Sequence, residues 1–257
     1  MQLIYILILA VFQGLTEFLP ISSSGHLAIL QHYLGMKEGG LLLSLVLHTG
    51  TLLAVVIYFA KDILALFRSL KYHKNPTLYY LILGSIPTAV IGLLIKKHYE
   101  ALSSLWIIGI MLFITGALLL IIKNAQENQG KNSFKKSLII GTVQGLAVLP
   151  GISRSGSTIA TAMLLKINKQ TAFTFSFLLS LPAIVGADLL ELIKLHQNPE
   201  AVPYSLWHLA AGFALSFLVG LGALVFLRKL ISSNKFHYFG YYCFLAGSLA
   251  IMGGIWS

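Results

Sequence analysis

The sequence predicts an all-α polytopic membrane protein, and three observations lead to this fold class. The chain of 257 residues is 57% hydrophobic and only 10% charged, whereas soluble domains carry about 25% charged residues. Two apolar stretches, at about 1–34 and 137–166, are each interrupted at the centre by a Pro, Gly and Ser cluster. Six other apolar segments approach the ~20 residues that cross a bilayer; they lie at about 41–60, 78–96, 105–122, 172–190, 208–227 and 238–256.

The two interrupted stretches predict re-entrant helical hairpins. Neither half of 1–34 or 137–166 is long enough to cross the hydrocarbon core. Non-helical backbone at membrane depth is tolerated only where protein or water satisfies its polar groups. We therefore expect the two interruptions to be buried within the protein.

The distribution of Lys and Arg predicts the topology. If the segment 61–77 is cytoplasmic, six spans place 123–136, 166–171 and 228–237 on the same side. Thirteen of the 18 Lys and Arg residues then lie on that side and four on the other, with Arg154 in a hairpin. Because cytoplasmic loops are enriched in Lys and Arg, we expect both termini outside.

The net charge of +10 has the same explanation. In a soluble chain such a charge would suggest nucleic acid, but here it matches basic loops that face anionic lipid headgroups. We therefore expect membrane lipids as partners and no nucleic acid.

The chain reads as one membrane domain, 1–257, made of two related halves. The segment QGLTEFLPISSSGH (13–26) aligns with QGLAVLPGISRSGS (144–157). The halves, at about 1–122 and 137–256, each contain one hairpin and three spans and are joined by a cytoplasmic loop at 123–136. Three spans per half insert the second half upside down. This is an inverted-topology repeat, in which broken helices place their ends around a polar ligand.

The chemistry is expected where the two copies differ. Ser23 in the first copy is replaced by Arg154 in the second, His26 is replaced by Ser157, and Glu17 has no polar counterpart. An ionisable group at the bilayer centre costs at least ~2.5–3.5 kcal/mol, which makes a functional role the default interpretation. The alternative is that Glu17 and Arg154 form an ion pair that only pins the hairpins together.

Gln13 and Glu17 are spaced i, i+4 and share one helical face. Two oxygen-bearing side chains so placed suit a divalent cation, or a general base held by its neighbour. We keep both interpretations open.

Each turn ends one half-helix and begins another, with the new helix pointing its free N–H groups towards the midplane. Ser22 and Ser153 are the expected N-caps. Helix N-termini favour anions, and the Arg154 guanidinium suits bidentate phosphate binding. The sequence therefore predicts a phosphate or pyrophosphate pocket. Its expected binding residues are Ser22, Ser24, Gly25, Ser153, Ser155, Gly156 and Thr158, with further hydroxyls on Ser23 and Ser157.

The sequence alone does not identify the nucleophile. Ser23 and His26 are spaced i, i+3, so either Ser23 attacks while a nearby base accepts its proton, or His26 itself becomes phosphorylated. A directly attacking water is the third alternative. His48, alone in its span, is expected to be structural.

At these residues the sequence resembles the undecaprenyl-pyrophosphate phosphatases of bacteria, also called bacitracin-resistance proteins. The resemblance covers essentially the whole chain. It includes an (E/Q)-x-x-x-E element at 13–17, a P-x-S-S-x-G-H element at 20–26 and P-G-x-S-R-S-x-x-T at 150–158.

The resemblance implies hydrolysis of undecaprenyl pyrophosphate to the monophosphate carrier used in cell-wall synthesis. It implies a bacterial plasma (inner) membrane location and a divalent cation, Mg²⁺ or Ca²⁺, held by Glu17 and Gln13. Glu17, Ser23, His26 and Arg154 are the implied catalytic residues. Gln13 stands where some members have Glu, which puts any two-glutamate mechanism in doubt.

Two other functions are weighed against this one. Inverted repeats with broken helices also build transporters, so a lipid-phosphate flippase using the same pocket is the alternative. The S-G-H of 24–26 superficially matches type 2 phosphatidic-acid phosphatases, but the other elements of that family are not found. A homodimer is left open.

Overall fold

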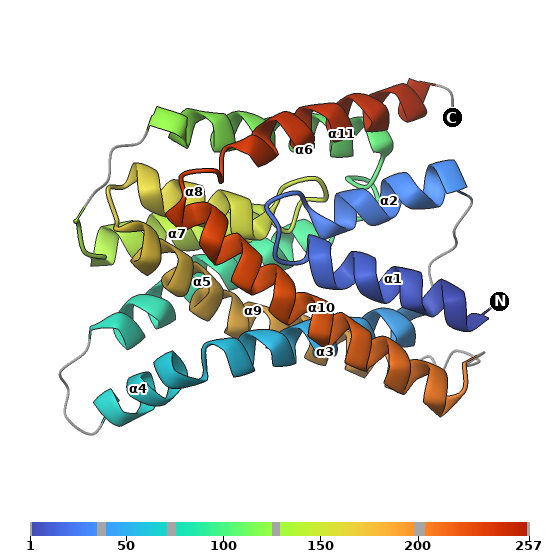
Figure 1. Cartoon of the computed structure of the whole chain (residues 1–257), viewed down its shortest axis with the longest axis horizontal. Coiled ribbons are helices and arrows are strands. Elements are labelled where there is room, and N and C mark those ends of the chain that lie inside the picture. The colour runs from blue at the N-terminus through green and yellow to red at the C-terminus, as the bar shows by residue number, and fades with distance from the viewer. Residues whose placement is uncertain (1, 35–39, 71–75, 125–128, 198–203, 256–257) are drawn as a thin grey trace.

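The computed structural model describes residues 2–34, 40–70, 76–124, 129–197 and 204–255, and within these ranges the regular structure is entirely helical (Figure 1). In chain order the helices are α1 (Gln2–Thr16), α2 (Ser23–Leu34), α3 (Gly40–Tyr58), α4 (Ala60–Leu70), α5 (Thr77–Lys96), α6 (Leu105–Ile121), the 3-10 turn η1 (Ile122–Asn124), α7 (Phe134–Leu146), α8 (Arg154–Leu164), α9 (Lys169–Gln197), α10 (Leu206–Ser232) and α11 (Tyr238–Ile255).

The helices confirm a multi-pass membrane protein. Five of them, α3, α5, α9, α10 and α11, are long and apolar enough to cross a membrane. The sixth predicted span is α6, whose 17 residues are about 26 Å long at 1.5 Å per residue. The outer face of α5 exposes Ile82, Ile86 and Val90 by more than half. Such a face is suited to lipid and not to water.

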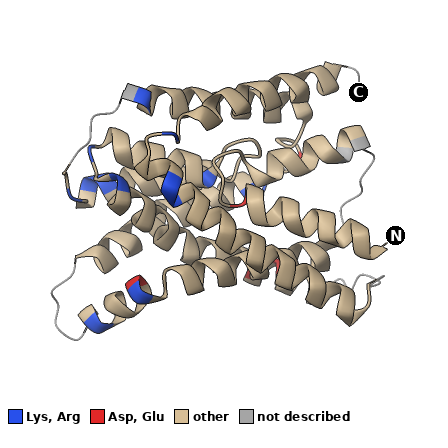
Figure 2. Ribbon diagram, viewed as in Figure 1, with Lys and Arg blue, Asp and Glu red and all other residues tan. Residues whose placement is uncertain are grey.

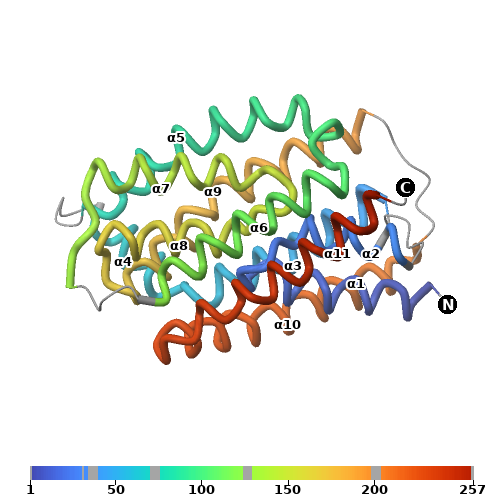
Figure 3. The backbone as a smooth tube through the Cα atoms, turned by 90° about the horizontal axis from the view of Figure 1, so that it is seen from above, coloured from blue at the N-terminus to red at the C-terminus, as the bar shows by residue number. Residues whose placement is uncertain are grey.

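Two helix pairs occupy the interrupted stretches, as predicted. α1 and α2 are separated by residues 17–22, and α7 and α8 by residues 147–153. In Figures 1 and 3 both turns lie in the interior of the bundle, and each second helix turns back towards the end from which the first one came.

The two halves pack in a matching way. α1 packs mainly against α10, while its counterpart α7 packs mainly against α5, the counterpart of α10. α1 begins at the end of the molecule where both termini lie, and α7 begins at the opposite end (Figures 1 and 3). This pairing supports the inverted repeat, which remains a proposal.

α6 and α11 cross at two pairs of closely packed glycines, and the internal repeat relates one pair to the other. A Cβ added at Gly109 would lie 2.8 Å from the carbonyl oxygen of Gly247, and one at Gly247 would lie 2.9 Å from that of Gly109. Gly116 and Gly240 approach each other in the same manner. The offset that aligns Gln13 with Gln144 also aligns Gly109 with Gly240 and Gly116 with Gly247. Gly109 thus contacts the counterpart of Gly116, and Gly116 contacts the counterpart of Gly109. This exchange is typical of an interface with two-fold symmetry.

Charge separates the two ends of the molecule (Figure 2). Most of the described Lys and Arg residues lie towards the end opposite the two termini. Lys37, Lys71 and Lys74, which entered the topology prediction, lie outside the described residues, as does part of the predicted 123–136 loop.

The structure corrects the predicted loops. Residues 61–70, expected within a loop, lie in α4, in which Ile63 and Leu66 pack on the core while Lys61 and Arg68 are exposed. An apolar stripe at helical spacing produces such a surface helix. α9 and α10 also extend beyond their predicted spans, to 29 and 27 residues, so that Arg228 and Lys229 lie on a helix and not in a loop.

The backbone of both turns passes through the left-handed region. Ser22 has φ +68° and Gly151 has φ +98°. At Gly151 there is also no room for a side chain, because a Cβ would lie 2.7 Å from Met111 Cβ and against the carbonyl oxygen of Ile108. Gly151 therefore sets how closely the second turn approaches α6.

Replacing Gly151 by Ala should lower the free energy of unfolding by about 2–4 kcal/mol, through backbone strain and overpacking. Thermal unfolding in detergent would measure the loss. Gly186→Ala is the matched control, because a Cβ there meets nothing within 4 Å, and a helical Gly→Ala change is expected to be neutral or favourable by up to about 1 kcal/mol. Equal stability of the two variants would contradict the packing described for the turn.

Candidate active site

The second half-helix of each hairpin is capped by its own turn, as predicted. Ser153 Oγ accepts the Gly156 N–H at 3.1 Å at the start of α8, and Ser22 Oγ accepts the Gly25 N–H at 3.3 Å at the start of α2. The N–H groups of the helical residues that precede Gly25 and Gly156 are not bound by these caps, and at a helix start they have no intrahelical acceptor. Both helices therefore present free donors at the centre of the bundle.

The two turns are joined to each other by direct contacts. The Gly151 N–H donates to Ser22 Oγ at 3.1 Å, and Ser155 Oγ donates to the carbonyl oxygen of Leu19 at 3.4 Å. A Cβ added at Gly25 would lie 3.2 Å from the Cα of Gly151. The halves thus form a single buried polar centre.

Each turn is also held by the last helix of the other half. Thr115 on α6 accepts the Ser153 N–H and donates to the carbonyl oxygen of Gly151, both at 3.1 Å. Cys243 on α11 donates to the carbonyl oxygen of Pro20 at 3.4 Å. α6 belongs to the first half and holds the second turn, while α11 belongs to the second half and holds the first.

Glu17 is the centre of the charged cluster. Its carboxylate accepts hydrogen bonds from Gln13 Nε2 at 3.2 Å and from Ser23 Oγ at 3.1 Å, and it forms an ion pair with Arg154. The Glu17 side chain is only 6% exposed, whereas that of Arg154 is 22% exposed. The structure therefore brings together Gln13, Glu17, Ser23 and Arg154 from both hairpins, as the sequence comparison predicted.

The Ser23 contact has a direct chemical meaning. A serine hydroxyl that donates to a buried carboxylate is oriented to lose its proton to that carboxylate when its oxygen attacks. This geometry would allow Glu17 to act as a base for Ser23, with the Arg154 guanidinium on the other carboxylate oxygen.

The remaining predicted phosphate-binding hydroxyls line the same turns. Ser24 Oγ lies 3.4 Å from Ser22 Oγ, and Ser155 Oγ lies 3.3 Å from Ser153 Oγ. Thr158 Oγ1 donates to the carbonyl oxygen of Arg154 at 2.8 Å, which steadies the first turn of α8.

His26 makes different contacts from those of Ser23. Its Nδ1 lies 2.8 Å from the carbonyl oxygen of Ser22, its Nε2 lies 2.8 Å from Tyr242 Oη, and its ring stacks on Tyr242. Ser23 donates to Glu17 and not to His26. Both ring nitrogens are therefore engaged away from the ion pair, and Tyr242 is a partner that sequence reasoning did not identify.

Two ionisable groups on distant helices also act on this cluster. His48 on α3 lies within electrostatic range of Glu17, and Asp188 on α9 lies within range of His48, Glu17 and Arg154. Asp188 Oδ2 is buried and accepts no hydrogen bond from any described residue. His48 therefore lies near the site, and its expected structural role stays a prediction. The one sequence signal for it was an ionisable side chain in an apolar span.

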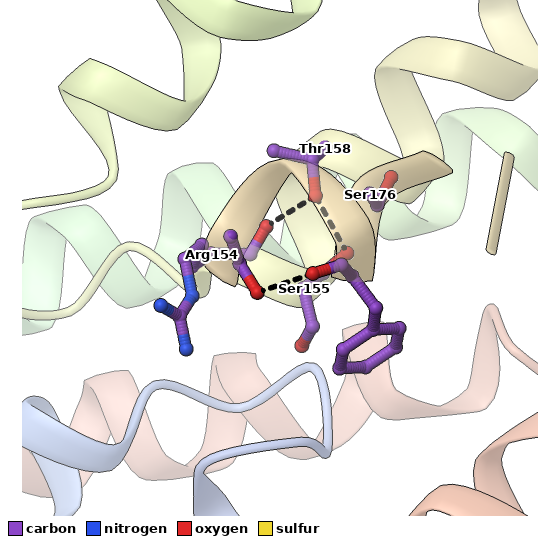
Figure 4. Close-up of a pocket in the computed structure, with 6 residues that line it drawn as sticks. Arg154, Ser155, Thr158 and Ser176 are labelled. Carbon is purple, nitrogen blue, oxygen red and sulfur yellow. Dashed lines mark hydrogen bonds between the residues drawn. The ribbon is translucent and has the colours of Figure 1, made fainter. Parts of the chain in front are cut away.

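A narrow pocket lies on the α9 side of Arg154 (Figure 4). It is too narrow to hold a water molecule beside its present side chains and is lined by Arg154, Ser155, Thr158, Ser176, Phe177 and Ser180. The three α9 residues had no distinguishing sequence pattern, because serine and phenylalanine side chains are both common in apolar helices.

The residues around Glu17 offer one carboxylate to a cation. Both Glu17 oxygens already accept hydrogen bonds, and the described part of the chain contains no cluster of three His, Cys, Asp or Glu side chains that could hold a metal. Mg²⁺ is commonly bound through one or two carboxylates together with substrate phosphates. The donor set therefore fits an ion that is completed by a phosphorylated ligand, and not an all-protein site.

Comparison with known proteins identifies the family to which the chain belongs. The sequence pattern described as "Bacitracin resistance protein BacA" matches residues 6–249. The chain is 41% identical to a protein of Desulfosudis oleivorans named undecaprenyl-diphosphatase, over 96% of this chain and 97% of the relative. It is 39% identical to one of the same name from Desulforapulum autotrophicum, over 99% of both chains.

A third similar protein carries the same name. The undecaprenyl-diphosphatase of Korarchaeum cryptofilum is 39% identical over 96% of this chain and 97% of the relative. Because the matched region contains both turns, the whole membrane domain and the cluster built around Glu17 and Arg154 fall within the comparison, and the chain belongs to the bacitracin resistance protein BacA family.

Proposed function

We propose that this chain hydrolyses undecaprenyl pyrophosphate to undecaprenyl phosphate and inorganic phosphate, which recycles the lipid carrier for cell-wall synthesis. The observation that carries the proposal is the Ser23–Glu17–Arg154 cluster at the junction of two helix N-termini. The names of the similar proteins support the substrate. The flippase alternative has no support from these relatives.

The prenyl chain lies in lipid between helices, and the pyrophosphate enters between the two turns. Arg154 and the free N–H groups at the starts of α2 and α8 bind the phosphates and stabilise charge in the transition state, as in other phosphoryl transfers. Glu17, with Gln13, would hold a Mg²⁺ or Ca²⁺ ion against the substrate, and such an ion neutralises phosphate charge when bound.

Ser23 is the preferred nucleophile. Its oxygen attacks the terminal phosphorus as its proton passes to Glu17, and the bond from that phosphorus to the bridging oxygen breaks, releasing undecaprenyl phosphate. Water then hydrolyses the phosphoserine to regenerate Ser23. Attack by His26, or directly by water, remains the alternative.

The chain is proposed to lie in the bacterial plasma membrane with both termini outside. The basic end of the molecule (Figure 2) would then face the cytoplasm, in agreement with the positive-inside rule.

Purified protein in detergent should release phosphate from polyprenyl pyrophosphate, and a chelator should abolish the release. Detergent removes the two compartments that transport requires, so phosphate release there identifies hydrolysis. If folded wild-type protein releases no phosphate when Mg²⁺ or Ca²⁺ is supplied, the enzymatic function is wrong.

Arg154→Lys should lower kcat/KM by about 10²–10³, because a point charge does not reproduce the planar guanidinium fork. Arg228→Lys is the matched control. Arg228 lies near the end of α10 and contacts Gln170, and its replacement should leave turnover unchanged. Near-normal turnover by a folded Arg154→Lys protein would contradict the phosphate role of Arg154.

A double-mutant cycle separates chemistry from a purely structural ion pair. Glu17→Gln and Arg154→Met should each lower stability by about 3 kcal/mol, because each leaves a partly buried charge unpaired, while the double variant should recover much of this loss. Thermal unfolding and phosphate release are measured on the same samples. All three variants should lack activity, and an active double variant would show that the pair only pins the hairpins.

A further inference from the structure

The pocket beside Arg154 joins the start of α8 to a helix to which the sequence assigned no function. Arg154, Ser155 and Thr158 lie on the first turn of α8, and Ser176 lies on α9 across from them (Figure 4). α9 also contributes Phe177 and Ser180 to the lining. The pocket thus has one wall from the proposed phosphate-binding turn and one wall from α9.

Ser176 is unusual among the hydroxyls of this pocket. The Thr158 hydroxyl donates to the carbonyl oxygen of Arg154, and the Ser180 hydroxyl donates to that of Phe177, both at 2.8 Å. Ser176 is 3% exposed, and its buried Oγ has no hydrogen-bond partner among the described residues. A serine within a helix ordinarily bonds to a carbonyl of its own preceding turn. An unpaired buried hydroxyl costs about 1–3 kcal/mol, and a ligand that accepts a hydrogen bond from Ser176 Oγ would remove this cost.

The opposite wall supplies donors for an anion. The N–H groups of Gly156 and Ser157 are bonded to Ser153. The N–H groups of Arg154 and Ser155, which precede them, have no acceptor within the helix. The positive end of the α8 dipole adds to these donors. The guanidinium of Arg154 now points to Glu17 and away from Ser176 (Figure 4), and it would join the donors by turning towards the ligand. A group with several acceptor oxygens and negative charge, such as a phosphate, matches this set.

We propose that Ser176 donates a hydrogen bond to a phosphate group of the bound substrate, which makes α9 the third wall of the phosphate site. The proposal rests on the function proposed above and extends it to a residue outside both sequence motifs. The pocket has no room for a water molecule beside its present side chains. A phosphate therefore enters as the Arg154 side chain, the more exposed partner of the ion pair, moves from Glu17 towards the ligand.

Inorganic pyrophosphate is the probe for the test. Its binding to purified wild-type and Ser176→Ala protein is measured by calorimetry in detergent, and KM is measured with polyprenyl pyrophosphate. Ser176→Ala should weaken pyrophosphate binding about tenfold or more, as expected for a hydrogen bond to a charged group. Thermal stability should stay equal or rise, because the substitution removes an unpaired polar group. Ser176→Cys, whose thiol is somewhat larger and donates only weakly, should give an intermediate affinity.

Ser85→Ala is the control, because Ser85 is also a serine within a span but its hydroxyl donates to Leu81 at 2.8 Å. Its pyrophosphate affinity should equal that of the wild type. Wild-type affinity in Ser176→Ala, or a loss of stability without a loss of affinity, would overturn the role of Ser176. These results are distinct from failure of the proposed function, which would appear as absence of phosphate release by the wild type.

Discussion

Backbone groups that leave a helix in the middle of a membrane must find hydrogen-bond partners within the protein, because lipid offers none. The structure meets this requirement by placing the two broken helices against each other. Ser22 Oγ receives N–H groups from its own helix and from Gly151 of the opposite turn, and Thr115 bonds the second turn on both sides of Ile152. The polar centre is therefore a condition of the fold, and it also leaves helix N-termini free to bind an anion.

The ion pair between Glu17 and Arg154 depends on that arrangement. Either charge alone would be costly at this depth, and only the meeting of the hairpins brings the two residues together from 137 positions apart. In the proposed reaction a phosphate would take the place of Glu17 beside Arg154, and the Glu17 carboxylate, which already accepts a hydrogen bond from Ser23, would then take the Ser23 proton.

Much of the fold could be predicted from the sequence because its signals are local. Hydropathy located the spans, Pro and Ser clusters located the breaks and the caps, and the internal alignment predicted that Glu17 and Arg154 would share a site. Contacts made by distant helices could not be predicted in this way. Gln13 and Gln144 align, yet Gln13 bonds to Glu17 while Gln144 bonds to the carbonyl oxygen of Leu179 at 3.0 Å. The Tyr242 partner of His26 and the unpaired hydroxyl of Ser176 depend on tertiary packing in the same way.

The crossed attachment of the turns has a consequence for biogenesis. Pro20 is held by Cys243, which lies on the last helix of the chain, and the second turn is held by Thr115 from the first half. A ribosome that has released only the first half into the membrane has therefore delivered a hairpin whose partners have not yet been made. The contacts of the first turn with Cys243 and Tyr242 can form only after the final helix has arrived, so a stalled chain that carries every residue of the first motif would still lack them.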